Sequence, residues 1–180
     1  MLEEVKQFVD ESFKNSSHPN TPDHLERTLG WLLKLKPDAD EAMQISAYAH
    51  DIARAFSSAD FEARPFDDRE YLNIHQKTGA EIISKFLAEN GYNEEIIKRV
   101  YNMIARHEDG GDVESDLIKD SDSLSYLERP AHIKPQFIEK LGKNKVKYKL
   151  DYMYNRISSE KAKELAKPYY TKALKMLESY

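Results

Sequence analysis

The chain has 180 residues, which suits one domain with a hydrophobic core and is short for two. Hydrophobic residues make up 40% of it and charged residues 33%, and its net charge of −5 argues against a general nucleic-acid binder, which needs a basic face. The absence of cysteine excludes disulfides and thiolate chemistry.

The N-terminal segment is predicted to be a short amphipathic helix. Leu2, Val5, Phe8 and Val9 form an apolar stripe at helical spacing, which fades at residues 15–17. The acidic start does not resemble a signal peptide, and no apolar run approaches the ~20 residues that a membrane span needs. We therefore expect a cytoplasmic protein with no membrane partner.

Two further helices are predicted before residue 56. A Thr-Pro-Asp sequence that begins at Thr21 provides a cap and a first-turn proline, so a helix is expected to follow, with His24 in its first turn. A strongly apolar helix is predicted from residue 39 to about residue 55. The stretch 56–69 contains a proline and many charges, and is expected to be an ordered loop or lid beside the site.

The remaining sequence also favours helices. They are predicted at about 75–89, 93–106 and 113–127. The last segment, 158–180, is expected to be helical, with Pro168 kinking it or splitting it in two. No convincing strand alternation and no internal repeat is present, so the sequence predicts one all-α domain.

Histidine and aspartate residues in the first two-thirds of the chain are candidate metal ligands. His50 and Asp51 follow an apolar run late in a predicted helix, where a buried charged pair is costly unless a cation compensates it. Nitrogen and oxygen ligands of this kind suit borderline divalent metals such as manganese, iron, zinc or nickel. The candidate ligands are His24, His50, Asp51, His75, His107 and Asp122.

Three cationic residues stand about one helical turn from these candidates. Arg27 follows His24, Arg54 follows the His-Asp pair, and Lys119 precedes Asp122. Each is a candidate for contact with an anionic, phosphate-bearing substrate.

The order of these ligands, together with the sequence around each, resembles the HD-domain superfamily of metal-dependent phosphohydrolases. The segments "HLERT", "AYAHDIAR", "HQKTGAEII", "RHEDGG" and "DSDSLSYLE" resemble successive motifs of its binuclear branch. The resemblance covers roughly residues 20–128, the expected metal-binding core. Residues from about 130 to 180 are expected to be a helical extension of the same single domain, 1–180, with a compact helical HD-domain fold.

The resemblance implies a division of labour among the ligands. His24, His50, Asp51 and Asp122 would hold a first metal, and Asp51 could bridge to a second metal held by His75 and His107. One or two divalent ions are implied (manganese, iron, nickel, zinc or magnesium), with Asp51, His75 and His107 in the catalytic roles.

The function implied is hydrolysis of a small phosphate ester, a nucleotide or dinucleotide, by a metal-activated water. Arg27, Arg54 and Lys119 would bind this phosphorylated substrate. The sequence Gly110-Gly111-Asp112 does not complete the Gly-Tyr-Pro motif of cyclic-di-GMP phosphodiesterases, which argues against that substrate. Asp120 could compete with Asp122 as the distal ligand, but Asp122 fits the family spacing better.

Two alternatives use the same residues. An HD-fold di-iron oxygenase has a similar ligand set, and a non-catalytic metal-bound sensor or scaffold would bind metal without turnover. A C-terminal aromatic cluster is interpreted as core or as a dimer surface, so a homodimer is left open. The lysine run 143–149 is interpreted as a solvated face.

Overall fold

The computed structural model describes residues 2–19, 21–62, 64–130 and 133–180, and within these ranges the regular structure is entirely helical. This confirms the predicted all-α class. The helices are α1 (Leu2–Phe13), α2 (Thr21–Leu35), α3 (Glu41–Ala49), η1 (Ile52–Ala55), α4 (Ala59–Glu62), α5 (Arg69–Glu89), α6 (Glu94–Ile104), α7 (Val113–Glu128), α8 (Pro135–Leu141), α9 (Lys143–Asn155) and α10 (Glu160–Glu178).

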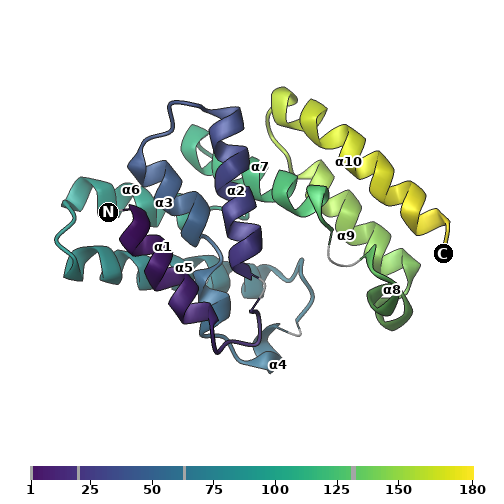
Figure 1. The fold of residues 1–180 in the computed structure, drawn as a ribbon, viewed down its shortest axis with the longest axis horizontal. Coiled ribbons are helices and arrows are strands. Elements are labelled where there is room, and N and C mark those ends of the chain that lie inside the picture. The colour runs from purple at the N-terminus through teal and green to yellow at the C-terminus, as the bar shows by residue number, and fades with distance from the viewer. Residues whose placement is uncertain (1, 20, 63, 131–132) are drawn as a thin grey trace.

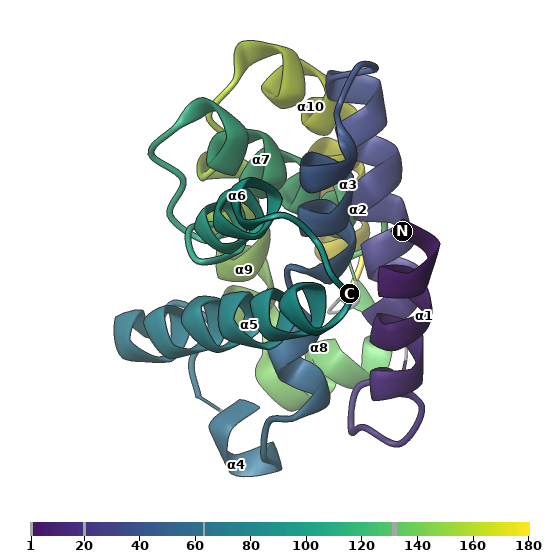
Figure 2. The same cartoon turned by 90° about the vertical axis from the view of Figure 1, so that its left-hand side faces the viewer.

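Helices α2 and α7 separate two hydrophobic clusters and contribute to both. One cluster joins them to α1, α3, α5 and α6, and the other joins them to α8, α9 and α10. In Figure 1 these two sets of helices lie on opposite sides of α2 and α7. Figure 2 shows α5 running crosswise to α1 and α2 beneath α6. The face of α2 that carries Trp31 belongs to the second cluster, whereas Leu25 and Leu29 belong to the first.

The helix predicted from 39 to 55 is interrupted at the His-Asp pair. Helix α3 ends at Ala49, and the chain continues as the tighter 3-10 helix η1. The Nδ1 atom of His50 lies 3.0 Å from the carbonyl oxygen of Ala47, which an uninterrupted α-helix would use for the amide of Asp51. The next turn instead closes with a hydrogen bond from the Arg54 amide to the Asp51 carbonyl, of 3-10 type.

Helix α5 begins earlier than the sequence predicted. The Asp68 side chain accepts hydrogen bonds from the amides of Glu70 and Tyr71, so it caps the helix. His75 therefore lies within α5 rather than at its start, and its backbone is held on both sides by helical hydrogen bonds. The segment expected to be a loop or lid contains the short helix α4.

The last helix is not split at its proline. Helix α10 continues through Pro168, so of the two expected outcomes, a kink or a split, the split does not occur. Pro168 and Glu164 are both exposed, so the carbonyl oxygen that loses its partner can be hydrated. None of the helices in the described part of the chain combines the length and apolar character that a membrane crossing requires.

Candidate metal centre

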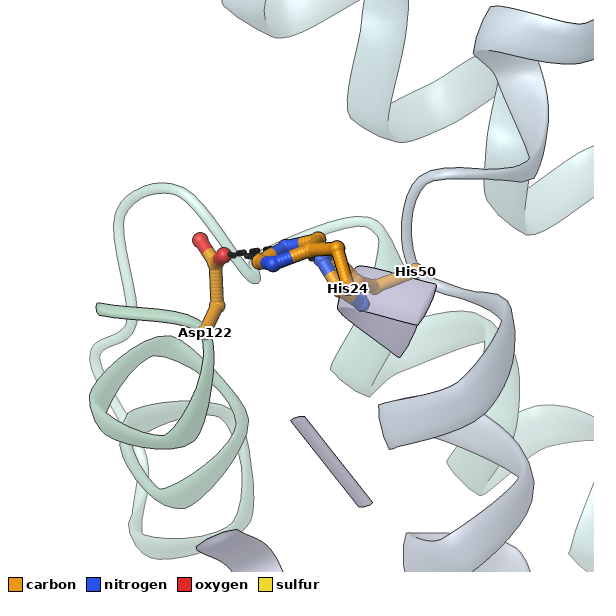
Figure 3. Close-up of side chains that lie close together, drawn as sticks. All are labelled: His24, His50 and Asp122. Atoms are coloured by element: carbon orange, nitrogen blue, oxygen red, sulfur yellow. Dashed lines mark ion pairs between the residues drawn. The ribbon is translucent and has the colours of Figure 1, made fainter. Parts of the chain in front are cut away.

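A first group of potential ligands comes from α2, the end of α3 and α7. One ligand atom each from His24, His50 and Asp122 lies within 4.8 Å of the others. Asp122 Oδ1 is 2.9 Å from His24 Nε2 and 3.7 Å from His50 Nε2, as the dashed lines in Figure 3 indicate. On the far side of the His24 ring, Nδ1 lies 2.8 Å from the Ser125 hydroxyl, which fixes the orientation of the ring.

A second group is fully buried and lies next to the first. Asp51, His75 and His107 also offer ligand atoms within 4.8 Å of one another. Asp51 Oδ1 is 2.9 Å from His75 Nε2, and the rings of His75 and His107 meet edge to face. The close approach of α5 depends on Gly79, because a Cβ there would lie 3.2 Å from the His50 carbonyl oxygen.

Hydrogen bonds to the backbone orient the rings of two candidate ligand histidines. Nδ1 of His50 faces the Ala47 carbonyl and Nδ1 of His107 faces the Ile104 carbonyl, at 3.0 and 2.7 Å. A carbonyl only accepts, so both Nδ1 atoms carry the hydrogen and both Nε2 atoms present a lone pair in the neutral ring. Each Nε2 is buried and has no hydrogen-bond partner in the described chain. Buried imidazole nitrogens of this kind fit a divalent cation.

The two groups are joined through Asp51. Its Oδ1 contacts His75, whereas its Oδ2 lies 3.9 Å from His50 Nε2 of the first group. The sequence assigned Asp51 to the first metal and allowed it to bridge to a second. The structure groups its carboxylate most closely with His75 and His107, and the number of ions that the six residues hold stays a prediction.

The titration of these residues reflects burial and their charged neighbours. Burial opposes a charge on His50, but the carboxylates of Asp51 and Asp122 outweigh it and raise the pKa of this imidazole to about 9. Burial lowers the pKa of His107 to about 4. Burial also acts against the ionised form of Asp122, yet Arg156 and His24 hold the pKa of this carboxyl well below its usual range.

Arg54 is the one sequence-predicted substrate cation that the structure joins directly to a candidate ligand. Its Nε is 3.0 Å from Asp51 Oδ2, and it donates a second hydrogen bond to the hydroxyl of Tyr71. The Tyr71 ring in turn stacks on His75. Although burial acts to raise the pKa of Asp51, Arg54 and His50 hold it well below its usual range. Arg54 therefore contacts a candidate ligand directly, and the substrate contact expected of it stays a prediction.

The other two predicted substrate cations are engaged elsewhere. Arg27 donates to the carboxylate of Asp23 one turn earlier in α2. Lys119 is buried and donates to Asp116 Oδ1 and to the Asp109 carbonyl, which closes the turn before α7. The contact of Arg27 thus links two successive turns of α2, and the contacts of Lys119 hold the turn before α7 in place. The phosphate contacts expected of them stay predictions.

Arg156 and Glu108 belong to the centre although the sequence did not single them out. Arg156 follows α9, and its guanidinium donates to Asp122 Oδ2, to Glu108 Oε2 and to the Ser123 hydroxyl. Glu108 Oε1 lies 3.7 Å from His107 Nε2. Glu108 directly follows the predicted ligand His107 in the sequence, and this position was the signal that could have identified it. Arg156 lies outside every motif, and its position depends on how α9 packs.

The neighbouring aspartates of α7 have different partners. Asp120 accepts hydrogen bonds from the amides of Ser158 and Ser159 and from the Ser159 hydroxyl, so it anchors the start of α10. Asp122 faces the histidines. Asp122, unlike Asp120, thus belongs to a group of side chains that could hold metal, and its role as the distal ligand stays a prediction.

The C-terminal lysines correct one interpretation, whereas the aromatic residues agree with theirs. The lysine run is not a uniform solvated face, because Lys149 is turned inward while Lys143, Lys145 and Lys147 are exposed. Most of the aromatic cluster packs against the C-terminal hydrophobic residues, as expected of core. Tyr152 additionally contacts Phe66 and lies near Arg156.

Fold and site together define an all-helical protein with two adjoining groups of histidine and aspartate side chains that could hold metal. The chain belongs to the family described as "Domain of unknown function (DUF4202)", whose model matches residues 6–177. Searches among curated proteins and among solved structures found no match.

Proposed function

We propose that the protein is a metal-dependent phosphohydrolase that acts on a small phosphate ester, a nucleotide or dinucleotide. The observation that carries the proposal is that the buried Nε2 atoms of His50 and His107 have no hydrogen-bond partner among the described residues, and each belongs to a group of potential ligands that contains a carboxylate. The resemblance to the binuclear branch of the HD-domain superfamily supports the same conclusion, because the six residues that carry it are the six that the fold brings together.

The donor set fits one or two divalent cations. His24, His50 and Asp122 would hold one ion, and His75 and His107 a second, with the two oxygens of Asp51 directed to either side. Metal held there would supply an activated water and a Lewis-acid contact for a phosphoryl oxygen. Imidazole and carboxylate ligands suit manganese, iron, nickel or zinc. Magnesium prefers oxygen ligands, so it fits this nitrogen-rich set less well.

The charge balance around the ligands favours an anionic substrate. Three carboxylates and three cations interact electrostatically there: Asp51, Glu108, Asp122, Arg54, Lys149 and Arg156. Once His50 has lost the proton that it carries at pH 7 in the metal-free protein, the side chains therefore roughly neutralise one another. Each divalent cation would add two positive charges to a largely buried site, and a phosphate group would compensate them.

The protein's own residues would orient these groups. Arg54 holds Asp51 through Oδ2 and is itself held by Tyr71, so two contacts fix the orientation of its guanidinium. In the proposed reaction Arg54 neutralises charge that develops on the phosphoryl oxygens. Arg156 fixes Asp122 and Glu108, so we assign it a positioning role.

The decisive experiment combines metal analysis with a substrate screen. Protein purified without added metal is analysed for bound ions, then assayed with phosphomonoesters, phosphodiesters and nucleotides after loading with each candidate metal. We expect phosphate or nucleotide release that a chelator abolishes and Asp51→Asn reduces by at least about 1000-fold. Asp67→Asn serves as the control and should retain activity; Asp67 is partly exposed, and its Oδ2 accepts a hydrogen bond from the Tyr148 hydroxyl.

Absence of turnover across the whole panel with every metal would count against the proposal. Oxygen consumption by iron-loaded protein, together with a mixed-valent iron EPR signal, would replace it with the di-iron oxygenase.

A further inference from the structure

Lys149 is directed from α9 into an aromatic enclosure beside the candidate metal centre. Its Nζ lies 4.3 Å from the ring centroid of Phe66, 5.3 Å from that of Tyr152 and 5.5 Å from that of Tyr126. It interacts electrostatically with the carboxylates of Glu108 and Asp122. Three aromatic faces stabilise a cation, but they leave its N–H donors without oxygen acceptors.

The ammonium of Lys149 has no hydrogen-bond or ion-pair partner within the described chain. No carboxylate oxygen of that part lies within 4.0 Å of Nζ, in contrast to the two arginines of the centre. Arg54 is paired with Asp51, and Arg156 with Asp122 and Glu108. Lys149 is thus the cation of this group whose hydrogen-bond donors remain available.

Keeping this ammonium out of water is unfavourable. Burial lowers the pKa of Lys149 to about 8, against the opposing influence of Glu108 and Asp122. Three aromatic rings lie within 5.5 Å of Nζ, and Lys149 as a whole is half-buried. An anion that supplied two or three oxygen acceptors would remove the cost of the unfilled donors.

We propose that Lys149 binds the phosphate group of the substrate through its free ammonium donors. This assignment rests on the phosphohydrolase function proposed above and adds a substrate-binding residue from α9. A tetrahedral phosphate held by metal at the ligand groups would present its outer oxygens to Lys149. Lysine suits this task because it acts as a point charge with three donors and needs no planar partner.

Binding of inorganic phosphate tests the assignment without requiring turnover. Protein loaded with Mn²⁺ is titrated with inorganic phosphate by calorimetry, and bound metal is measured in every sample. We compare wild type with Lys149→Met, which keeps the length of the side chain without its charge, and with Lys149→Arg. Lys145→Met, an exposed position one turn earlier on α9, is the matched control.

We expect Lys149→Met to weaken phosphate binding by about tenfold to a hundredfold, with unchanged metal content. Lys149→Arg should recover part of the loss, and Lys145→Met should behave as wild type. Equal phosphate affinity in wild type and Lys149→Met, or no phosphate binding by the manganese-loaded wild type, would overturn the assignment.

A second measurement uses the wild-type chain alone and so does not depend on how a variant folds. Acetic anhydride modifies accessible amines, and mass spectrometry reports the extent at each lysine. Phosphate should slow acetylation of Lys149 severalfold in manganese-loaded protein and leave Lys145 unaffected; equal rates with and without phosphate would contradict the proposal. Phosphate binding that depends on Lys149, joined to inactivity in the substrate screen, would reject the hydrolase function while retaining the anion site.

Discussion

The two oxygens of the Asp122 carboxylate have different partners: Oδ2 accepts a hydrogen bond from Arg156, and Oδ1 lies 2.9 Å from His24 Nε2. One oxygen is thereby fixed by a cation from the C-terminal part of the chain, and the other is directed toward the histidines. Since Arg156 also binds Glu108, a single guanidinium orients acidic groups beside both candidate ligand groups.

Loss of this guanidinium should be strongly destabilising in metal-free protein. Arg156→Met leaves Asp122 and Glu108 buried without their cation, which is expected to cost about 3–5 kcal/mol in the free energy of unfolding. Urea denaturation measures this change. Added divalent metal should recover part of it, because bound metal supplies positive charge beside Asp122. Arg129→Met, at an exposed arginine, should change stability little; a similar loss there would contradict the assignment.

Metal binding should release a proton near neutral pH. The pKa of His50 is raised to about 9 in the metal-free protein, so at pH 7 its ring is protonated, and Nε2 must lose that proton to bind metal. Affinity should therefore rise by about tenfold per pH unit from pH 7 to pH 9 and level off above it. His107, with its pKa lowered to about 4, is already neutral and adds nothing in this range.

Calorimetric titrations in buffers of different ionisation enthalpy count the released protons. Release close to one per chain at pH 7 is expected, and the number should fall toward zero in the His50→Gln variant. An affinity for metal that is independent of pH over this interval would refute the assignment of His50 as a ligand.

Neighbouring aspartates of α7 provide a matched test of the distal ligand. Asp122→Asn should lower metal affinity by at least the roughly 10- to 100-fold that loss of an outer-sphere partner costs. Asp120→Asn should leave metal content unchanged, because Asp120 bonds to the start of α10. Its effect should appear in thermal unfolding instead. Elemental analysis of the two variants decides the question, and equal metal loss in both would show that the two residues are not separated in function.

The turn before α7 should tolerate no side chain at Gly110. Its φ is +72°, and a Cβ would lie 2.0 Å from Asp116 Oδ1 and 2.5 Å from Lys119 Nζ. Gly110→Ala should therefore destabilise the protein by about 2–4 kcal/mol, from backbone strain together with the lost contact. Gly91→Ala tests the strain alone, since Gly91 has φ +77° with open space around it. Similar unfolding midpoints for the two variants would show that the Asp116–Lys119 contact contributes little.

The sequence predicted the fold class and the residues of the two groups that could hold metal, because both leave local signals. Helical spacing of apolar residues indicated most of the helices, and the His-Asp pair stood out within an apolar run. The end of α3 was missed because the His50 side chain competes for the Ala47 carbonyl, which no periodicity reveals. Pro168 does not split α10, and its exposure there, which leaves the freed carbonyl oxygen open to water, could not be foreseen from the sequence.

The positions of the charged residues were harder to predict. Arg54 was predicted to lie near the His-Asp pair, and it does so because one 3-10 turn separates it from Asp51. Lys119 is equally close to Asp122 in the sequence, but its ammonium is directed to Asp109 and Asp116 in the turn before α7. Closeness in the sequence therefore did not predict which side chains the lysine contacts. Arg156 and Lys149 enter the centre only because α9 packs against α7, and long-range packing of this kind has no counterpart in local sequence patterns.

The placement of Arg156 and Lys149 on the far side of α7 has a practical consequence for anyone shortening the chain. All six candidate ligands occur by residue 122, so a fragment ending at Glu128 would keep every residue of the recognisable motif. It would lack the arginine that neutralises Asp122 and would expose the apolar side of Leu124 and Leu127 to water. Such a fragment would be a poor minimal version of the protein, and searches or designs that copy only the motif would omit two of the three arginine and lysine side chains that interact with the carboxylates of the centre.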